Sequence, residues 1–408
     1  MTSKINARAA KSVPLANFLN SGAIVTGSTG LALWTKSLNL SSLQVGALGA
    51  CSANAFGAAF GALIGGWIAD RWGRQMIFRY DMLVYLLGTI LIICAPNFFL
   101  LLTGFIVTGL AVGGGIPTTW TYAGESTDSH GRAHSVGITQ FAWTIGPAII
   151  YAIGGMVAPL GLIGTRILFS LLSIVAIITW QLQCQLAKIT PPASGHQDAH
   201  PYRALFTNPT NLKSLLFLLG VYLFWNLVAG AMGFFMPYVY VQAGGLTNLQ
   251  ANALQMVLWA CTGLGTYFFF AKLGDRYPYR QLFACGALGE IVAWVILTYG
   301  GMNWTCLILF ILIYGLAAGL GAQQWYSLWT TELFPAKYRA SAQGLSFFIV
   351  YGCSGIWSLF FPSLLKIGGL KVLGTVLILF LVISLVVGVI WTPHTQGKSL
   401  QEIIKERY

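Results

Sequence analysis

The sequence predicts an all-α membrane protein in which twelve transmembrane helices form two pseudo-symmetric six-helix bundles. Three observations carry this prediction: an apolar composition, apolar stretches long enough to span a bilayer, and charged signatures that occur twice in the same order. Hydrophobic residues make up 56% of the chain and charged residues 8%, whereas soluble domains carry about 25% charged residues. A chain this apolar cannot hide its side chains in one water-soluble core, so we expect a multi-pass membrane protein.

The apolar stretches set the individual helices, because a spanning helix needs about 20 mostly apolar residues. Six stretches precede a polar segment and six follow it. The predicted spans are 14–35, 43–69, 76–95, 98–124, 133–156, 162–186, 213–242, 248–273, 281–300, 303–331, 340–365 and 371–392. Their even number places both termini on the same side of the membrane.

The basic residues orient these spans. If both termini are cytoplasmic, only Lys36, Arg166, Lys366 and Lys371 of the 22 Lys and Arg residues lie outside, which agrees with the positive-inside rule. We therefore expect a cell-membrane protein with cytoplasmic termini. The net charge of +12 then reflects topology, and no nucleic-acid partner is expected. We expect no cleavable signal peptide either, because no clear small-residue cleavage pattern follows the first apolar segment.

The polar segment divides the chain. We expect an N-terminal bundle over 1–186, a cytoplasmic linker over 187–212, a C-terminal bundle over 213–392 and a cytoplasmic tail over 393–408. All seven cysteines lie in apolar runs, which is typical of buried thiols rather than of disulfides or a zinc site. The spans contain no nucleophile–base pair, metal cluster or phosphate-binding loop, so we expect neither an enzyme nor a cofactor or metal.

Two charged signatures recur in the two halves. Asp70–Arg71 follows the second span and Asp275–Arg276 the eighth; Glu125 and Arg132 are separated by the same number of residues as Glu332 and Arg339. Recurrence in the same order and at nearly one offset indicates a duplicated six-helix unit. Transporters are often built from such repeats, with the substrate site between them near the middle of the membrane.

These motifs also resemble a known family. The stretch GGWIADRWGR resembles the signature of the major facilitator superfamily, and ESTDSHGR and ELFPAKYR resemble the paired Glu…Arg motifs of its sugar porter and organic-ion branches. TPHTQGKSLQEI resembles a variant of the sugar porter ending, with His394 in the position of its Glu. The resemblance covers the whole chain and implies the major facilitator fold with transport by alternating access.

The charged residues near the cytoplasmic helix ends are candidates for gating. A carboxylate there can pair with Arg or with a helix N-terminus, and contacts that form in one state and break in another create the two states that alternating access needs. The resemblance implies that they close the cytoplasmic side. The candidate gating residues are Asp70, Arg71, Arg74, Glu125, Arg132, Asp275, Arg276, Arg280, Glu332 and Arg339.

Amides and aromatic residues of the spans are candidates for substrate binding. The resemblance places the cavity among the first, fourth, seventh and tenth helices. Amides both donate and accept hydrogen bonds, and aromatic faces stack on apolar ring faces, so a neutral polyhydroxylated solute fits. The candidates are Asn20, Ser21, Gln140, Trp143, Trp225, Asn226, Gln255, Trp259, Gln323, Gln324, Trp325 and Trp357.

The charged residues inside the spans narrow the range of possible substrates. No Lys or Arg lies at mid-span, which disfavours an anionic substrate. Glu290 lies near mid-membrane and is a candidate for proton coupling, with a hydrogen-bonded structural carboxyl as the alternative. Asp81, near a helix start, is expected in the charged belt. Gln140 lies eight residues after Arg132, and this spacing matches that of a sugar-binding Gln in sugar porters.

Other positions depart from the sugar porter pattern. Ser21 stands for the Asp of the first helix, Phe105 for the Arg of the fourth, and Phe224–Trp225 for the Gln pair of the seventh. These departures put proton symport by the family's route, and an ordinary hexose, in doubt.

Three functions remain open from the sequence. The first is a secondary active or facilitative transporter of a small neutral sugar or polyol, acting as a monomer in the lipid bilayer with protons as a possible coupling ion. The second is a transporter or exporter of an amphipathic aromatic compound or an organic cation. The third is a transport-inactive sensor, which the short tail disfavours.

Overall fold

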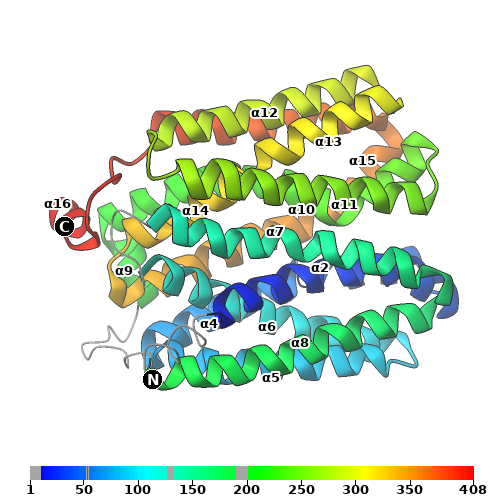
Figure 1. Ribbon diagram of the computed structural model, residues 1–408, viewed down its shortest axis with the longest axis horizontal. Helices are drawn as coiled ribbons and strands as arrows, with labels where there is room; N and C mark the ends of the chain where they lie inside the picture. Colours follow the sequence, from blue (N-terminus) through cyan, green and yellow to red (C-terminus); the bar gives the residue numbers. More distant parts are fainter. Residues whose placement is uncertain (1–10, 52, 54, 126–131, 190–200) are drawn as a thin grey trace.

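The computed structural model describes every residue except 1–10, 52, 54, 126–131 and 190–200. The described residues are almost entirely helical, and none of them forms a β-strand. Long helices run side by side along the longest axis (Figure 1). This arrangement confirms the predicted all-α class, which satisfies every backbone polar group inside the bilayer.

The helices follow the predicted spans. The first half contains α2 (Ser12–Ser37), α3 (Ser42–Ala50), α4 (Phe56–Trp72), α5 (Arg74–Ile93), α6 (Phe98–Glu125), α7 (Arg132–Val157), η2 (Ala158–Leu160) and α8 (Leu162–Ile189). The remainder contains α9 (Pro201–Thr207), α10 (Pro209–Gly244), α11 (Asn248–Gly265), η3 (Thr266–Ala271), α12 (Tyr279–Gly300), α13 (Trp304–Ala318), α14 (Ala322–Leu333), η4 (Ala336–Tyr338), α15 (Arg339–Ile390) and α16 (Leu400–Arg407). In the described part, ten helical stretches are long and apolar enough to cross a membrane.

Four predicted spans differ in continuity from single straight helices. The second is interrupted between α3 and α4, and the tenth between α13 and α14. The eleventh and twelfth are joined in α15, where Gly369 has a non-helical φ of 64° that glycine adopts without strain. The chain turns back there, so that α15 leads to α16 at the left end of the bundle in Figure 1.

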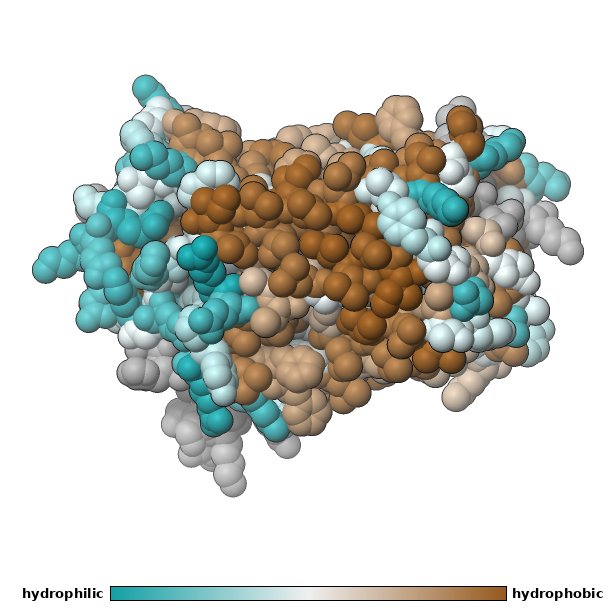
Figure 2. All heavy atoms as spheres, turned by 90° about the horizontal axis from the view of Figure 1, so that it is seen from above, coloured by the Kyte–Doolittle hydropathy of each residue, from teal (hydrophilic) through white to brown (hydrophobic). Residues whose placement is uncertain are grey.

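The surface carries the band that a bilayer requires. On the face seen in Figure 2, a hydrophobic band crosses the middle of the molecule, and hydrophilic residues gather at both ends. Leu87, Ile174 and Leu379, on three different helices, each expose more than half of their surface, at 54%, 56% and 55%. An apolar exposed area of this extent marks contact with lipid, so the protein spans the membrane several times.

Candidate functional site

A cavity lies in the interior where α2 and α7 of the first half meet α10, α11 and α14 of the second. Its volume is about 70 Å³, which is room for a few water molecules. Small-molecule pockets typically measure about 300–1,000 Å³. The cavity is therefore contracted in this conformation.

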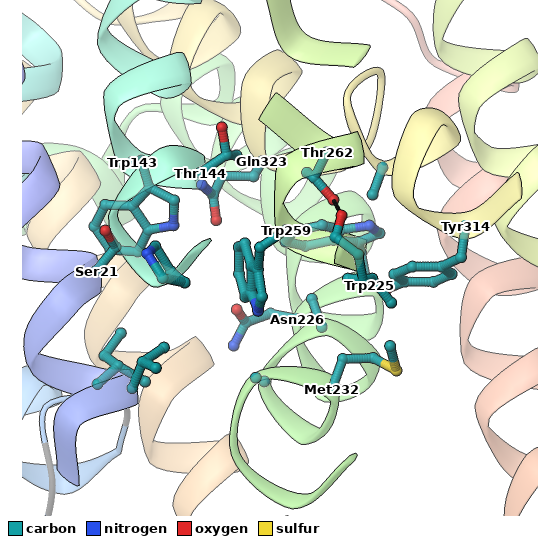
Figure 3. A pocket seen from close by; sticks show the side chains of 18 of the residues that line it. Ser21, Trp143, Thr144, Trp225, Asn226, Met232, Trp259, Thr262, Tyr314 and Gln323 are labelled. Carbon is teal, nitrogen blue, oxygen red and sulfur yellow. Dashed lines mark hydrogen bonds between the residues drawn. The ribbon is translucent and has the colours of Figure 1, made fainter. Parts of the chain in front are cut away.

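Seven of the predicted binding residues line this cavity. They are Ser21, Trp143, Trp225, Asn226, Trp259, Gln323 and Gln324. Figure 3 shows Trp259 and Asn226 at its centre, with Ser21 and Trp143 facing them from the other half of the molecule. None of the described residues that line the cavity is charged, so its chemistry is that of amides, hydroxyls and indole rings.

The polar groups of the cavity are partly paired. Gln323 Nε2 on α14 donates to Gln140 Oε1 on α7 over 2.9 Å, which links the two halves beside the cavity. Asn226 Nδ2 donates to Ser354 Oγ over 2.9 Å. Gln324 Oε1 and Trp259 Nε1 are buried and have no hydrogen-bond partner among the described residues. An unpaired buried polar group costs about 1–3 kcal/mol, so these atoms are available to a ligand's hydroxyls.

Four other predicted binding residues lie outside the lining. Gln140 is directly behind Gln323. Gln255 donates to the carbonyl of Met232 over 3.4 Å. Trp325 donates to Leu320 O and packs between aromatic rings away from the cavity, and Trp357 packs against two phenylalanines.

Asn20 also lies outside the lining, fully buried between helices of the first half.

The cavity includes polar residues that the motifs did not single out. They are Thr144, Thr262 and Tyr314. Thr144 follows Trp143 directly, and Thr262 lies one turn after Trp259 on the same face of α11. Helical spacing from the two tryptophans could have found both threonines. Tyr314 comes from the first segment of the interrupted tenth span, where no periodic signal points inward.

Glu290 sits directly behind the cavity wall. It is fully buried in α12, and Trp225 Nε1 donates to both of its carboxylate oxygens, over 2.9 and 3.0 Å. A Cβ on Gly321 would lie 2.8 Å from Glu290 Oε1 and 3.2 Å from Trp225 Nε1. The glycine at the break between α13 and α14 therefore makes room for this pair.

The predicted gating residues gather at one end of the bundle. Asp70, at the end of α4, accepts hydrogen bonds from the backbone N–H groups of Ala340 (3.2 Å) and Ser341 (2.6 Å) at the start of α15. Asp275 accepts from the N–H groups of Ala133 (3.2 Å) and His134 (3.1 Å) at the start of α7. Each carboxylate thus caps a helix N-terminus of the opposite half.

A buried ion pair lies beside the cap formed by Asp275. Arg132 Nη1 is 2.8 Å from Glu332 Oε1, and both side chains are almost fully buried. The hydroxyl of Thr395, in the tail, donates to Glu332 Oε2 over 2.6 Å. We call the set Asp70, Asp275, Arg132 and Glu332 the latch.

The other predicted gating residues lie around the latch. Arg74 interacts electrostatically with Asp70. Arg71 lies over the ring of Trp67, 5.4 Å from its centroid. Arg339 Nε donates to Phe334 O over 3.0 Å. Arg276 and Arg280 are exposed. Glu125 ends α6, and its side chain lies outside the described residues.

The tail after α15 packs against the end of the bundle that carries the latch. α16 is capped by Ser399, whose backbone N–H donates to Glu402 while its hydroxyl accepts from the N–H of Glu402. The hydrogen bonds from Ser399 lower the pKa of the Glu402 carboxyl. Arg407, in the last turn of α16, donates to Ser214 Oγ of α10. The tail is therefore fixed against the same end of the bundle.

Comparisons with known proteins agree with this geometry. A family model described as Major Facilitator Superfamily matches residues 15–359. The minor myo-inositol transporter IolF of Bacillus subtilis (strain 168) is 41% identical over 405 residues, covering 97% of this chain and 92% of that protein. The glucose transporter GlcP of Staphylococcus epidermidis is 25% identical over 393 residues, covering 85% of each.

Solved structures show the same fold. The chain superposes on the proton:xylose symporter XylE bound to 6-bromo-6-deoxy-D-glucose with a TM-score of 0.83 at 17% identity, covering all of both chains. Against the xylose transporter XylE from E. coli in a partially occluded inward-open conformation, the TM-score is 0.74 at 17% identity, covering 97% of this chain and all of that one.

Proposed function

The chain belongs to the major facilitator superfamily, and we propose that it carries a small neutral polyol of the cyclitol or sugar class across the cell membrane. The observation that carries this proposal is the uncharged cavity between the two halves, lined by amides, hydroxyls and indole rings. A polyol offers hydroxyls to Gln324 and Asn226 and C–H faces to Trp259 and Trp143. The likeness to a myo-inositol transporter supports a cyclitol as the first substrate to test.

Transport proceeds by alternating access, with the latch closing the cytoplasmic end while the cavity is reached from outside. Both termini are cytoplasmic, so the end that carries the latch and α16 faces the cytosol. The two bundles, 1–186 and 213–392, rock against each other around the cavity. One chain contains both bundles and the whole cavity, so the monomer is the working unit.

Coupling to protons is assigned to Glu290. Its carboxylate accepts hydrogen bonds from Trp225, which lines the cavity, and a membrane-embedded acid is costly. Protonation of Glu290 would remove the charge and leave one carbonyl oxygen as acceptor, so the hydrogen bond from Trp225 Nε1 in the cavity wall would weaken. This links a proton to substrate binding.

Uptake into proteoliposomes tests the proposal. Labelled myo-inositol, glucose and xylose are offered with and without an inward proton gradient, and muconate and nicotinate serve as charged aromatic or unsaturated competitors. We expect myo-inositol uptake that unlabelled polyols compete for and the charged compounds do not. Uptake of the charged compounds alone would overturn the neutral-polyol assignment.

A further inference from the structure

A second buried carboxylate lies outside the cavity and the latch. Asp81 is in the second turn of α5 and only 6% exposed, so it is not part of the charged belt at the helix end, where the sequence places it. Gln183 Nε2 of α8 donates to Asp81 Oδ2 over 3.2 Å, and the N–H of Met82 donates to Oδ1 over 2.6 Å. No basic side chain in the described part of the chain forms an ion pair with it.

Unpaired amide groups surround this carboxylate. Asn20 of α2 is fully buried, and within the described part of the chain neither its Nδ2 nor its Oδ1 has a hydrogen-bond partner; Gln183 Oε1 is also buried and unpaired there. A Cβ on Gly115 of α6 would lie 3.1 Å from Asp81 Oδ2 and 3.7 Å from Asn20 Nδ2. Gly115 therefore leaves open the space that the acid and the amide share.

The polar groups of this cluster lie at one depth. Asp81 is seven residues from the start of α5, which is about 10 Å along a helix. Asn20 is eight residues from the start of α2, and Gln183 is six residues from the end of α8. Thr118, one turn after Gly115 on the same face of α6, adds a buried hydroxyl without a partner. Four helices thus bring oxygen-bearing side chains to one level inside the first half.

The energetics of the cluster favour the binding of a cation. A buried carboxylate without a counter-charge costs several kcal/mol, and each unpaired amide group costs about 1–3 kcal/mol. The oxygen and nitrogen of an amide exchange places by rotation, so Asn20 and Gln183 can both turn their oxygens towards a cation held by Asp81. Hard cations prefer such carboxylate, amide and hydroxyl oxygens.

We propose that Asp81, Asn20 and Gln183 form a binding site for a small monovalent cation, either a sodium ion or a proton. Either ion neutralises the Asp81 carboxylate; a sodium ion also binds both amide oxygens, whereas a proton gives the carboxyl one O–H donor for one of them. The titratable neighbours are Cys184 on α8 and Tyr85 on α5. Cys184 interacts electrostatically with Asp81, Arg79 and Lys188. Asn20 and Gly115 face the acid from α2 and α6.

The site is connected to the cavity through α2. Asn20 immediately precedes Ser21, which lines the cavity, and Tyr85, one turn beyond Asp81, donates to Leu19 O over 3.3 Å. Binding of the ion would therefore fix α2 against α5 and set the position of Ser21. This connection rests on the proposed transport function, whereas the ion site itself does not.

Thermal unfolding of the purified full chain tests the site without any transported substrate. Wild type and Asp81→Asn are compared in sodium chloride and choline chloride at equal ionic strength, and across pH. For a sodium site, sodium raises the unfolding temperature of the wild type only. For a proton site, sodium has no effect, and the difference between the unfolding temperatures of the two proteins changes with pH. If neither sodium nor pH separates them, the proposal is wrong.

Two further variants, one a second test of the site and one a control, complete the experiment. Gln183→Leu removes a ligand and keeps the acid, so it should weaken the sodium or pH response if Asp81→Asn does not fold. Glu406→Gln removes an exposed carboxylate of α16 and should respond as the wild type does. An equal loss of response in Glu406→Gln would assign the effect to general charge and overturn the site. Loss of myo-inositol uptake with an intact ion response would refute the transport proposal alone.

Discussion

The carboxylate of Asp70 accepts a 2.6 Å hydrogen bond from the backbone N–H of Ser341, in the other half of the chain. Asp275 makes the equivalent contact with His134 in the reverse direction. Negative charge at a helix N-terminus contributes about 0.3–1 kcal/mol, and up to ~2 kcal/mol when partly buried. Two such caps therefore stabilise the closed latch by an amount that a transport cycle can reverse.

The first prediction concerns these caps. Asp70→Asn keeps the side-chain shape and removes the charge, so the latch should open more often and the turnover should fall by about 5- to 30-fold, as expected for one or two kcal/mol. Labelling of a cysteine introduced at Ala340, from the cytoplasmic side, measures the opening. We expect faster labelling in Asp70→Asn at an unchanged amount of inserted protein. Wild-type turnover and labelling would contradict the assignment.

The buried ion pair gives a second prediction. Breaking a buried pair costs about 3–5 kcal/mol because one charge remains unpaired, so Glu332→Gln should lower the unfolding temperature more than Asp70→Asn does. Thr395→Val removes only one hydrogen bond to the same carboxylate and should cost about 1 kcal/mol. Exchange of Arg132 and Glu332 in one double variant should recover part of the loss. An additive double variant would show that the two side chains do not interact.

Glycines at the contact between halves give a third prediction. A Cβ on Gly344 of α15 would lie 2.3 Å from the carbonyl oxygen of Ala62 of α4, so Gly344→Leu should prevent the closed state and stop transport while the cytoplasmic end stays accessible. Gly352 on the same helix has no atom within 4 Å of the corresponding position. Gly352→Leu is therefore the matched control and should keep its transport. Equal loss in both variants would indicate a general effect on α15.

The sequence predicts the spans well because a bilayer leaves few alternatives to helices about 20 residues long. The sequence also identifies the repeated acids, because the spacing of the charged signatures can be compared directly between the two halves. It does not predict that Asp70 meets the start of α15, because this contact joins segments that are far apart in the chain. Trp325 and Trp259 look alike as sequence, and only the packing of α14 and α11 separates a core residue from a cavity residue.

The cavity gives a fourth prediction. Trp259→Phe removes an unpaired indole N–H from the cavity, and loss of one hydrogen bond to a neutral ligand costs about 0.5–1.5 kcal/mol. The KM for the transported polyol should therefore rise by about 2- to 10-fold, with little change in the amount of protein. Trp357→Phe changes a tryptophan that packs outside the cavity and should leave the KM unchanged. The opposite pattern would place the substrate elsewhere.

Glu290 and Trp225 give the last prediction. Glu290→Gln cannot exchange a proton but still offers an oxygen to Trp225 Nε1, so the indole keeps its place. We expect proton-driven accumulation to be lost while exchange of labelled for unlabelled substrate continues. Glu290→Leu leaves the buried indole N–H unpaired and should impair exchange as well. If Glu290→Gln accumulates substrate as the wild type does, Glu290 only positions Trp225, and Asp81 becomes the acid to test for coupling.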